Sequence, residues 1–429
     1  MTYIEAITRA KLTDLPESYA TLWEGFTPSP RGVLWRDEEL LEHQELFAFN
    51  DELTATILHV KATIEADETL HTLAQFVHWS IFVRTKPFLA ERPNSVTPQA
   101  MGDDKGLFAM VILIAEAFRT LPVIAQYKLD YDRITGNFKS LNNGAHEYKK
   151  EHGHWGLNSF HWNCNCVVPY MNRCGHLTFE PVSYDNPYSA YVHKVTGEIL
   201  VLADDNVGCT ADGLLTSHNC PFPEAFKTTV RQEGKYTIAH KIDPLGFIEC
   251  EPSRHNLSEY ELAFKQWDVL LAFHIPSGPG YTVDACADSF KKAVKFFNET
   301  FPDIDIKGIC CYSWLYTPQL RLILSPEESE MVRIQEHCYQ VPAWRDSGAY
   351  NRFVFKVDGK LNEIELPQNS RLHRRLAAVV NRGGYLTSGG MVLPLAAIDK
   401  WKDTVYDSGA SLETYVKAQP HDCGDLRDL

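Results

Sequence analysis

The sequence lacks an excess of basic residues. It has 41 Lys and Arg against 56 Asp and Glu, which gives a formal net charge of −15, and no cluster of Lys or Arg stands out along the chain. Affinity for duplex nucleic acid depends largely on basic side chains that neutralise phosphates, so we expect no nucleic-acid partner. An anionic ligand would need a locally positive or dipole-lined pocket.

Long uninterrupted apolar runs are also missing. The most apolar stretch, 107–124, contains Glu116 and Arg119, whereas a membrane-spanning helix needs about 20 mostly uncharged residues. We therefore predict a buried helix there and no membrane partner. The first five residues have neither the basic nor the apolar region of a signal peptide, so we expect a cytoplasmic protein.

Internal repeats and low-complexity tracts are absent as well, and what is present has the composition of an ordinary globular protein. Hydrophobic residues make up 44% of the chain, charged residues 23% and aromatic residues 12%, which favours a folded chain with a sizeable core over disorder. A length of 429 residues accommodates two domains at roughly 100 to 200 residues each. The 11 cysteines are an odd number, and we expect them to be reduced thiols.

The pattern of apolar residues changes along the chain. Stripes with helical spacing run through 40–60, 70–81 and 108–124, whereas short alternating segments separated by turn signals follow Trp155. We therefore predict an α+β protein with a helical N-terminal part. Strands are expected at 177–180, 190–193, 198–202, 236–239, 267–275, 306–312 and 350–356, and helical segments at 283–299, 318–324 and 371–381.

The segment 272–282 is a candidate anion site, because it joins a predicted strand to a predicted helix. Thr282 is a good helix N-cap, and the first helical turn behind it presents unsatisfied N–H groups and the positive end of the helix dipole. Gly278 and Gly280 would let the backbone approach a phosphate closely. Glycine and proline are also typical of any strand-to-helix turn, so a plain turn is the alternative.

Thiols and phenols cluster between residues 310 and 316. Cys311 would need a neighbouring base to act as a nucleophile, and no Cys/His spacing identifies one, so a buried structural cysteine is the favoured interpretation. Tyr312 and Tyr316 are candidate proton donors, and His274 at the end of the strand before the glycines is a candidate base. Packing is the alternative role of each.

No metal site is predicted. Cys164, Cys166, Cys174 and His176 follow one another closely, but their spacing matches none of the usual C-x₂₋₄-C patterns of zinc sites. The acidic residues within 204–212 are too few and wrongly spaced for a calcium loop. A solvated turn is the better interpretation.

An ordered set of short motifs runs through roughly residues 115–395. The motifs are Gly153-His154-Trp155-Gly156-Leu157, Leu177-Thr178-Phe179-Glu180, Thr196-Gly197-Glu198, Leu202-Ala203-Asp204-Asp205, Ala211-Asp212-Gly213, Ile242-Asp243-Pro244-Leu245-Gly246, His274-Ile275-Pro276, Ala285-Cys286 with Ser289, Cys311-Tyr312-Ser313-Trp314-Leu315, Pro318-Gln319-Leu320 and Gly383-Gly384-Tyr385-Leu386-Thr387-Ser388-Gly389-Gly390. As a set they resemble a family of acyltransferase-domain proteins, which pair an N-acyltransferase N-terminal domain with a GNAT-like C-terminal domain. Residues 1–110 match weakly and the tail not at all.

The resemblance implies a helical N-acyltransferase-type domain over 1–155, a GNAT-like mixed α/β domain over 156–400 and a tail over 401–429. GNAT-type enzymes hold the pyrophosphate of an acyl-CoA on backbone amides between a central strand and the following helix. The residues that would line this place are Ile275, Ser277, Gly278, Gly280 and Thr282, with Trp314 as a pocket wall.

The loop departs from the family pattern in one respect. GNAT enzymes usually carry an Arg/Gln-x-x-Gly-x-Gly/Ala string there, which this chain does not contain, and Pro279 lacks an amide N–H. Our first hypothesis is a CoA-dependent transfer of an acyl group, from acetyl-CoA or a longer acyl-CoA, to an amine of a small molecule or peptide. His274 would be the base and Tyr312 or Tyr316 the acid. The missing string favours the alternative, a non-catalytic GNAT-like binding or scaffold protein. A third hypothesis is cysteine-dependent acyl transfer or hydrolysis at Cys311.

Overall fold

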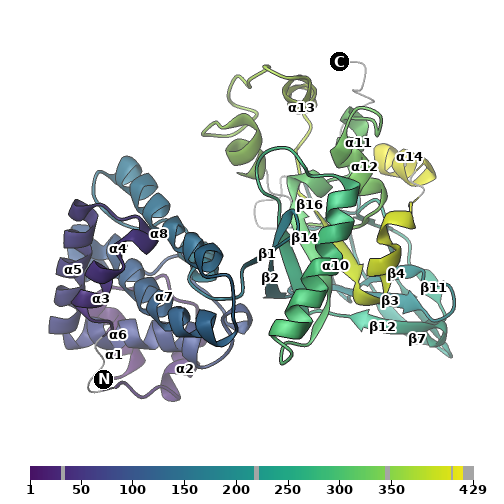
Figure 1. Cartoon of the computed structure of the whole chain (residues 1–429). Coiled ribbons are helices and arrows are strands. Elements are labelled where there is room, and N and C mark those ends of the chain that lie inside the picture. Colours follow the sequence, from purple (N-terminus) through teal and green to yellow (C-terminus); the bar gives the residue numbers. More distant parts are fainter. Residues whose placement is uncertain (30–33, 217–221, 344–347, 407–408, 419–429) are drawn as a thin grey trace. The chain divides into compact units, whose positions relative to one another are not determined.

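The computed structural model describes residues 1–29, 34–216, 222–343, 348–406 and 409–418. The chain forms two compact units, Met1–Asn172 and Arg173–Leu429 (Figure 1). The first is built from helices and the second from several sheets with helices between their strands, so the predicted α+β class with a helical N-terminal part is confirmed.

Twelve helical segments make up the described part of the first unit. They are α1 (Tyr3–Ala10), α2 (Ser18–Glu24), α3 (Asp37–Glu42), α4 (Gln44–Phe47), α5 (Asp51–Ala66), α6 (Glu68–His78), the π-helix η1 (Trp79–Val83), the 3₁₀-helices η2 (Pro87–Leu89) and η3 (Gln99–Leu107), α7 (Phe108–Gln126), α8 (Tyr131–His152) and α9 (Phe160–Cys166).

Helix α7 belongs to the core of the first unit. Every residue from Phe108 to Ala117 is buried, which confirms the predicted buried helix at 107–124. The helical run Gln99–Gln126 is long and apolar enough to cross a membrane, but 72% of its most apolar stretch is buried inside the protein. The core helix of a globular protein can be equally long and apolar, and burial of this kind is typical of such a helix.

The second unit is organised around a six-stranded sheet. Its strands lie in the order β1 (Asn172–Cys174), β2 (Leu177–Ser183), β13 (Val269–His274), β14 (Ile306–Ser313), β16 (Gly389–Pro394) and β15 (Tyr339–Pro342). The smaller sheets are β12 (Tyr260–Phe264) with β3 (Tyr188–His193) and β4 (Ile199–Ala203); β11 (Ser253–His255) with β8 (Tyr236–Ala239) and β7 (Val230–Glu233); β10 (Phe247–Ile248) with β9 (Ile242–Asp243); and β5 (Gly208–Cys209) with β6 (Phe226–Lys227).

Helices connect and cover these strands. They are α10 (Val283–Thr300), α11 (Leu320–Ile323), α12 (Glu330–Glu336), α13 (Arg371–Asn381) and α14 (Gly409–Ala418), the 3₁₀-helices η4 (Leu257–Glu259), η5 (Trp314–Tyr316) and η7 (Leu395–Asp403), and the π-helix η6 (Tyr350–Phe355). The predicted helices at 283–299 and 371–381 are therefore confirmed, as are the predicted strands before residue 313.

Different elements cover the two faces of the large sheet. On one face, the rings of Phe179 in β2 and Phe273 in β13 pack on Phe290 of α10, at centroid distances of 6.3 and 5.4 Å, and α10 lies across the strands in Figure 1. On the other face, Leu270 and Cys310 share a hydrophobic core with residues of β3 and β4. The central strands are thus buried on both sides.

Segment 350–356 is not the strand that its alternation predicted. It forms the π-helix η6, in which Tyr350, Val354 and Phe355 are buried and Phe353 is 61% exposed. The Tyr350 hydroxyl donates a hydrogen bond of 2.9 Å to the carbonyl of Thr387. The Tyr350 hydroxyl needs this acceptor because it is buried, and the buried residues 350, 354 and 355 have helical spacing. Together these two constraints outweigh the strand propensity of the segment.

The compact units divide after Asn172, whereas the sequence-based boundary follows residue 155. Helix α9 belongs to the first unit: the Thr120 hydroxyl donates to the carbonyl of Val167 at 2.7 Å, and Ser140 donates to Asn163 at 2.8 Å. The predicted tail over 401–429 also contributes to the second unit as far as Ala418, because Trp401 and the α14 residue Tyr415 are buried. Residues 419–429 lie outside the described part.

Candidate functional site

The two central strands of the large sheet separate at their carboxyl ends. Strands β13 and β14 are parallel and pair only as far as Ala272 and Cys310. Beyond this point β13 continues to His274 and β14 to Ser313, each paired with its outer neighbour. Ligands of open α/β sheets bind outside the carboxyl ends of strands, so this opening is the candidate site.

His274 lies at this opening and has a buried carboxylate as its partner. Its Nε2 is 2.8 Å from Oε1 of Glu180 in β2, and the side chains are 36% and 7% exposed. Register explains the contact: Glu180 is paired with Ala272, so its side chain lies diagonally opposite His274 on the same face. A carboxylate acceptor favours the tautomer with the proton on Nε2 and orients the imidazole.

The two predicted tyrosine acids lie on opposite faces of the sheet. Tyr312 is on the face of His274, because Ala272 and Cys310 are partners. Its ring lies over Gly390, where an added Cβ would come within 2.4 Å of the ring, and its hydroxyl donates to Tyr184 at 3.4 Å. Tyr316 is 1% exposed, and its ring lies 6.4 Å from that of Phe273, which is on the α10 face.

Tyr316 forms part of the support beneath the candidate cofactor loop. Its hydroxyl makes a short hydrogen bond with that of Tyr281, the residue before the N-cap of α10, and burial raises the pKa of both phenols. The structure therefore brings Tyr316 to the loop but not to the face of His274. This contact ties the loop to η5, at the end of β14.

The predicted loop residues lie together between β13 and α10. Ser277, Gly278 and Gly280 are exposed, and the two glycines have φ of 106° and 107°, a region that side chains rarely adopt. The space around Gly278 is open, whereas a Cβ at Gly280 would lie 2.9 Å from Cε1 of His176. Nε2 of His176 is buried without a hydrogen-bond partner among the described residues.

The start of α10 is capped as the sequence predicted. The Thr282 side chain accepts a hydrogen bond from the N–H of Ala285 at 3.2 Å. The N–H of Val283 is also engaged, because it donates to Oε1 of Glu330 in α12 at 3.3 Å. A carboxylate from another helix thus lies at the positive end of the α10 dipole.

The two remaining residues predicted to bind the cofactor are Ile275 and Trp314. Ile275 begins the loop directly after β13 and is half-buried. The ring of Trp314 packs on Tyr350 at 5.7 Å, next to the hydrophobic core around α11 and α13, so Trp314 has a packing role there.

The predicted cysteine nucleophile is buried. Cys311 is 6% exposed, and burial raises the pKa of its thiol well above the ordinary value, so the thiolate that a nucleophile needs is disfavoured.

No group of three or more metal-ligating side chains forms within the described ranges. Cys164 and Cys166 are buried in α9 of the first unit, whereas Cys174 and His176 belong to the second.

The turn between β1 and β2 is fixed on α10. The Ser289 hydroxyl in α10 accepts a hydrogen bond of 2.9 Å from the backbone N–H of His176 in this turn.

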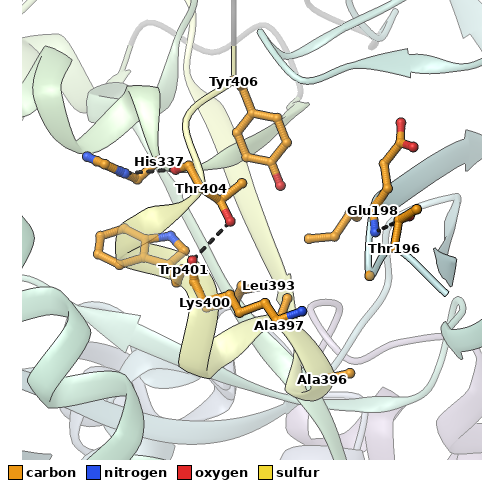
Figure 2. A pocket seen from close by; sticks show the side chains of 12 residues that line it. Thr196, Glu198, His337, Leu393, Ala396, Ala397, Lys400, Trp401, Thr404 and Tyr406 are labelled. Carbon is orange, nitrogen blue, oxygen red and sulfur yellow. Dashed lines mark hydrogen bonds between the residues drawn. The ribbon is translucent and has the colours of Figure 1, made fainter. Parts of the chain in front are cut away.

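A cavity of about 270 Å³ occurs elsewhere in the second unit. Figure 2 shows it between the β3–β4 turn, η7 and Tyr406, with the Lys400 and Glu198 side chains at its wall. Trp401 and Leu393 contribute apolar surface. None of the predicted site residues lines this cavity, so it is separate from the opening at β13 and β14.

Sequence reasoning missed three residues of the site: Glu180, His176 and Glu330. Each reaches the site from an element distant in sequence, through strand register or helix packing, and no local spacing indicates such contacts. For Glu180 a signal was present, because it stands in the motif Leu177-Thr178-Phe179-Glu180. A charged residue in a strand needs a partner when it is buried.

The fold has a recognisable family. The model of the GNAT-like C-terminal domain matches residues 171–393. The chain belongs to this family. No curated protein matches it.

Solved structures with this fold cover both units. An acyltransferase in complex with decanoyl-CoA aligns with a TM-score of 0.57 at 17% identity, over 92% of this chain and all (100%) of that one. A mutant acyltransferase with octanoyl-CoA gives 0.55 at 16% identity, and an acyltransferase with decanoyl-CoA and teicoplanin gives 0.54 at 17%, both with the same 92% and 100% coverage. At this identity the likeness establishes the fold alone.

Proposed function

We propose that this protein transfers an acyl group from acyl-CoA to an amine of a small molecule or peptide. The observation that carries the proposal is the separation of β13 and β14 after Ala272 and Cys310, with α10 starting beside the opening. Structures of the same fold are acyltransferases in complex with decanoyl-CoA or octanoyl-CoA.

The loop between β13 and α10 fits the diphosphate of coenzyme A. Its glycines expose backbone, and the α10 N-terminus supplies N–H groups and a positive dipole end. The buried, unpartnered Nε2 of His176 lies next to Gly280 and supplies a further donor when that nitrogen is protonated.

His274 is placed to remove a proton from the attacking amine. Glu180 orients the imidazole and stabilises its charged form once it takes the proton. The nitrogen then attacks the thioester carbonyl, a tetrahedral oxyanion forms, and the C–S bond breaks with release of the thiolate. Backbone N–H groups at the ends of β13 and β14, which do not pair with each other beyond Ala272 and Cys310, are the candidate donors to the oxyanion.

Tyr312 is the better candidate for the acid that protonates the leaving thiolate. It shares the face of His274, whereas Tyr316 is buried beneath the loop. Tyr312 would have to exchange its hydrogen bond with Tyr184 for one to the thiolate. One related structure is an acyltransferase in complex with both decanoyl-CoA and teicoplanin, which supports an acceptor other than a macromolecule.

Thiol release from acetyl-CoA and decanoyl-CoA, in the presence of a panel of amines, tests the proposal. His274→Ala should lower kcat by about 10²- to 10⁴-fold, the usual contribution of a general base, while Cys311→Ala should retain activity. Equal activity of wild type and His274→Ala would exclude His274 as the base. Loss of activity in folded Cys311→Ala would favour the cysteine mechanism instead.

The second candidate is a non-catalytic binding protein with the GNAT-like fold. Pro279 in the loop and the Glu330 carboxylate on the Val283 N–H favour it, because both reduce the number of amides offered to a phosphate. Absence of thiol release with every amine, in a protein that binds a ligand at the same opening, would support this candidate.

A further inference from the structure

Glu330 occupies the position of an anion at the start of α10. The first N–H groups of a helix have no partner within the helix, and two of those in α10 are engaged differently. Ala285 donates to its own N-cap, Thr282, whereas Val283 donates to Oε1 of Glu330 at 3.3 Å. Glu330 belongs to α12, on the other side of β14 in sequence.

The contacts of the Glu330 carboxylate are weak enough for a stronger anion to displace it from the α10 N-terminus. Its side chain is 28% exposed and forms an ion pair with Arg333, whose side chain is 56% exposed and lies one turn further along α12. Neither the ion pair nor the hydrogen bond to Val283 is buried. Ion pairs that solvent reaches contribute little to stability, so the fold loses little when the carboxylate is released.

A diphosphate and this carboxylate cannot share the site. Both are anions that would use the Val283 N–H and the same positive dipole end, so each weakens the binding of the other. We propose that Glu330 is an internal competitor of the acyl-CoA diphosphate, so that the donor binds only when Glu330 leaves the α10 N-terminus. The inference rests on the proposed function and concerns the regulation of that same site.

The proposal predicts the sign of a charge-removing substitution. Glu330→Gln removes the competing charge and should tighten binding of coenzyme A by about two- to fivefold, the range expected for one charge at a helix terminus. Pantetheine lacks the diphosphate, so its affinity should not change. Glu299→Gln is the matched control, since it removes the same charge from the exposed end of α10, about 24 Å away along the helix.

Calorimetric titration of the full chain with coenzyme A and with pantetheine separates the outcomes. The competition is supported if Glu330→Gln binds coenzyme A more tightly than wild type, while its affinity for pantetheine and the affinity of Glu299→Gln for coenzyme A are unchanged. Equal or weaker binding of coenzyme A by a Glu330→Gln protein with wild-type Tm overturns it while the proposed function stands. If neither wild type nor the variant binds coenzyme A, the proposed function fails and the competition with it. Glu330→Ala provides a second variant, to be interpreted in the same way.

Discussion

At the residue scale, the account depends on the hydrogen bond between His274 and Glu180. The carboxylate is buried on β2 and approaches the imidazole at 2.8 Å. A buried carboxylate is costly unless it is paired, so this contact accounts both for the presence of a buried acidic residue in β2 and for a fixed orientation of the imidazole.

Substitution of Glu180 should therefore reduce turnover more than donor binding. We expect Glu180→Leu to lower kcat for acyl transfer by about tenfold or more, because an unoriented base loses part of its 10²- to 10⁴-fold contribution, with KM for acyl-CoA within about twofold of wild type. The kcat of Glu180→Gln, which keeps a hydrogen-bond acceptor, should lie between those of wild type and Glu180→Leu. A purely structural role would instead change Tm and KM together and leave kcat unaffected.

Sequence identified His274 but not its partner. A histidine at the end of a strand before glycines is visible in the chain, whereas the contact with Glu180 depends on the register of β2 against β13. The same holds for His176, whose ring lies against Gly280 because Ser289 fixes the preceding turn on α10. Contacts between distant segments are set by register and packing, which local spacing does not encode.

At the element scale, local signals predicted helix ends well. The end of α13 at Gly383 and Gly384 follows the expected capping pattern: the N–H of Gly384 bonds the carbonyl of Val379 at 2.9 Å, and that of Gly383 bonds Val380 at 3.0 Å. By contrast, the π-helix η6 was predicted as a strand, because its conformation depends on burial of Tyr350 in a core assembled from several elements.

Helix α13 is anchored by an acidic residue that titrates. The buried guanidinium of Arg375 donates to Glu328 at 2.9 Å, and Arg371 adds a second contact at 2.6 Å. The hydrogen bond from Arg375 is the main cause of the lowered pKa of Glu328. A lowered pKa in the folded state means that the unfolded state binds more protons, so this stabilisation is present above the ordinary glutamate pKa of about 4.3 and is lost as pH falls through the lowered value.

Glu328→Gln should consequently lower Tm at pH 7 and have little effect under strongly acidic conditions. Thermal unfolding of wild type and variant between pH 2 and 7 measures the difference. Glu363→Gln is the control, since Glu363 forms an exposed pair with Lys360 and its loss should change Tm little at any pH. A Tm difference for Glu328→Gln that does not depend on pH would contradict the ionic origin of the contact.

At the scale of the whole molecule, composition and motif order predicted the class and the family. The net charge of −15 and the apolar fraction indicated a folded protein without a nucleic-acid partner, and the motif set indicated a GNAT-like C-terminal domain, which the match over 171–393 confirms. The division of the chain after Asn172 was not predicted, because α9 joins the first unit through packing on α7 and α8.

The central claim is that acyl-CoA binds at the loop between β13 and α10. Calorimetric titration with acetyl-CoA and decanoyl-CoA tests it most directly when wild type is compared with Ser277→Trp, which fills the exposed loop at a position without left-handed backbone. Val195→Trp, at a residue that is 88% exposed in the β3–β4 turn, is the control. We expect wild type and the control to bind a donor with Kd roughly in the micromolar range and Ser277→Trp to bind it at least about tenfold more weakly. No heat from folded wild type, or equal binding by Ser277→Trp, would contradict the claim.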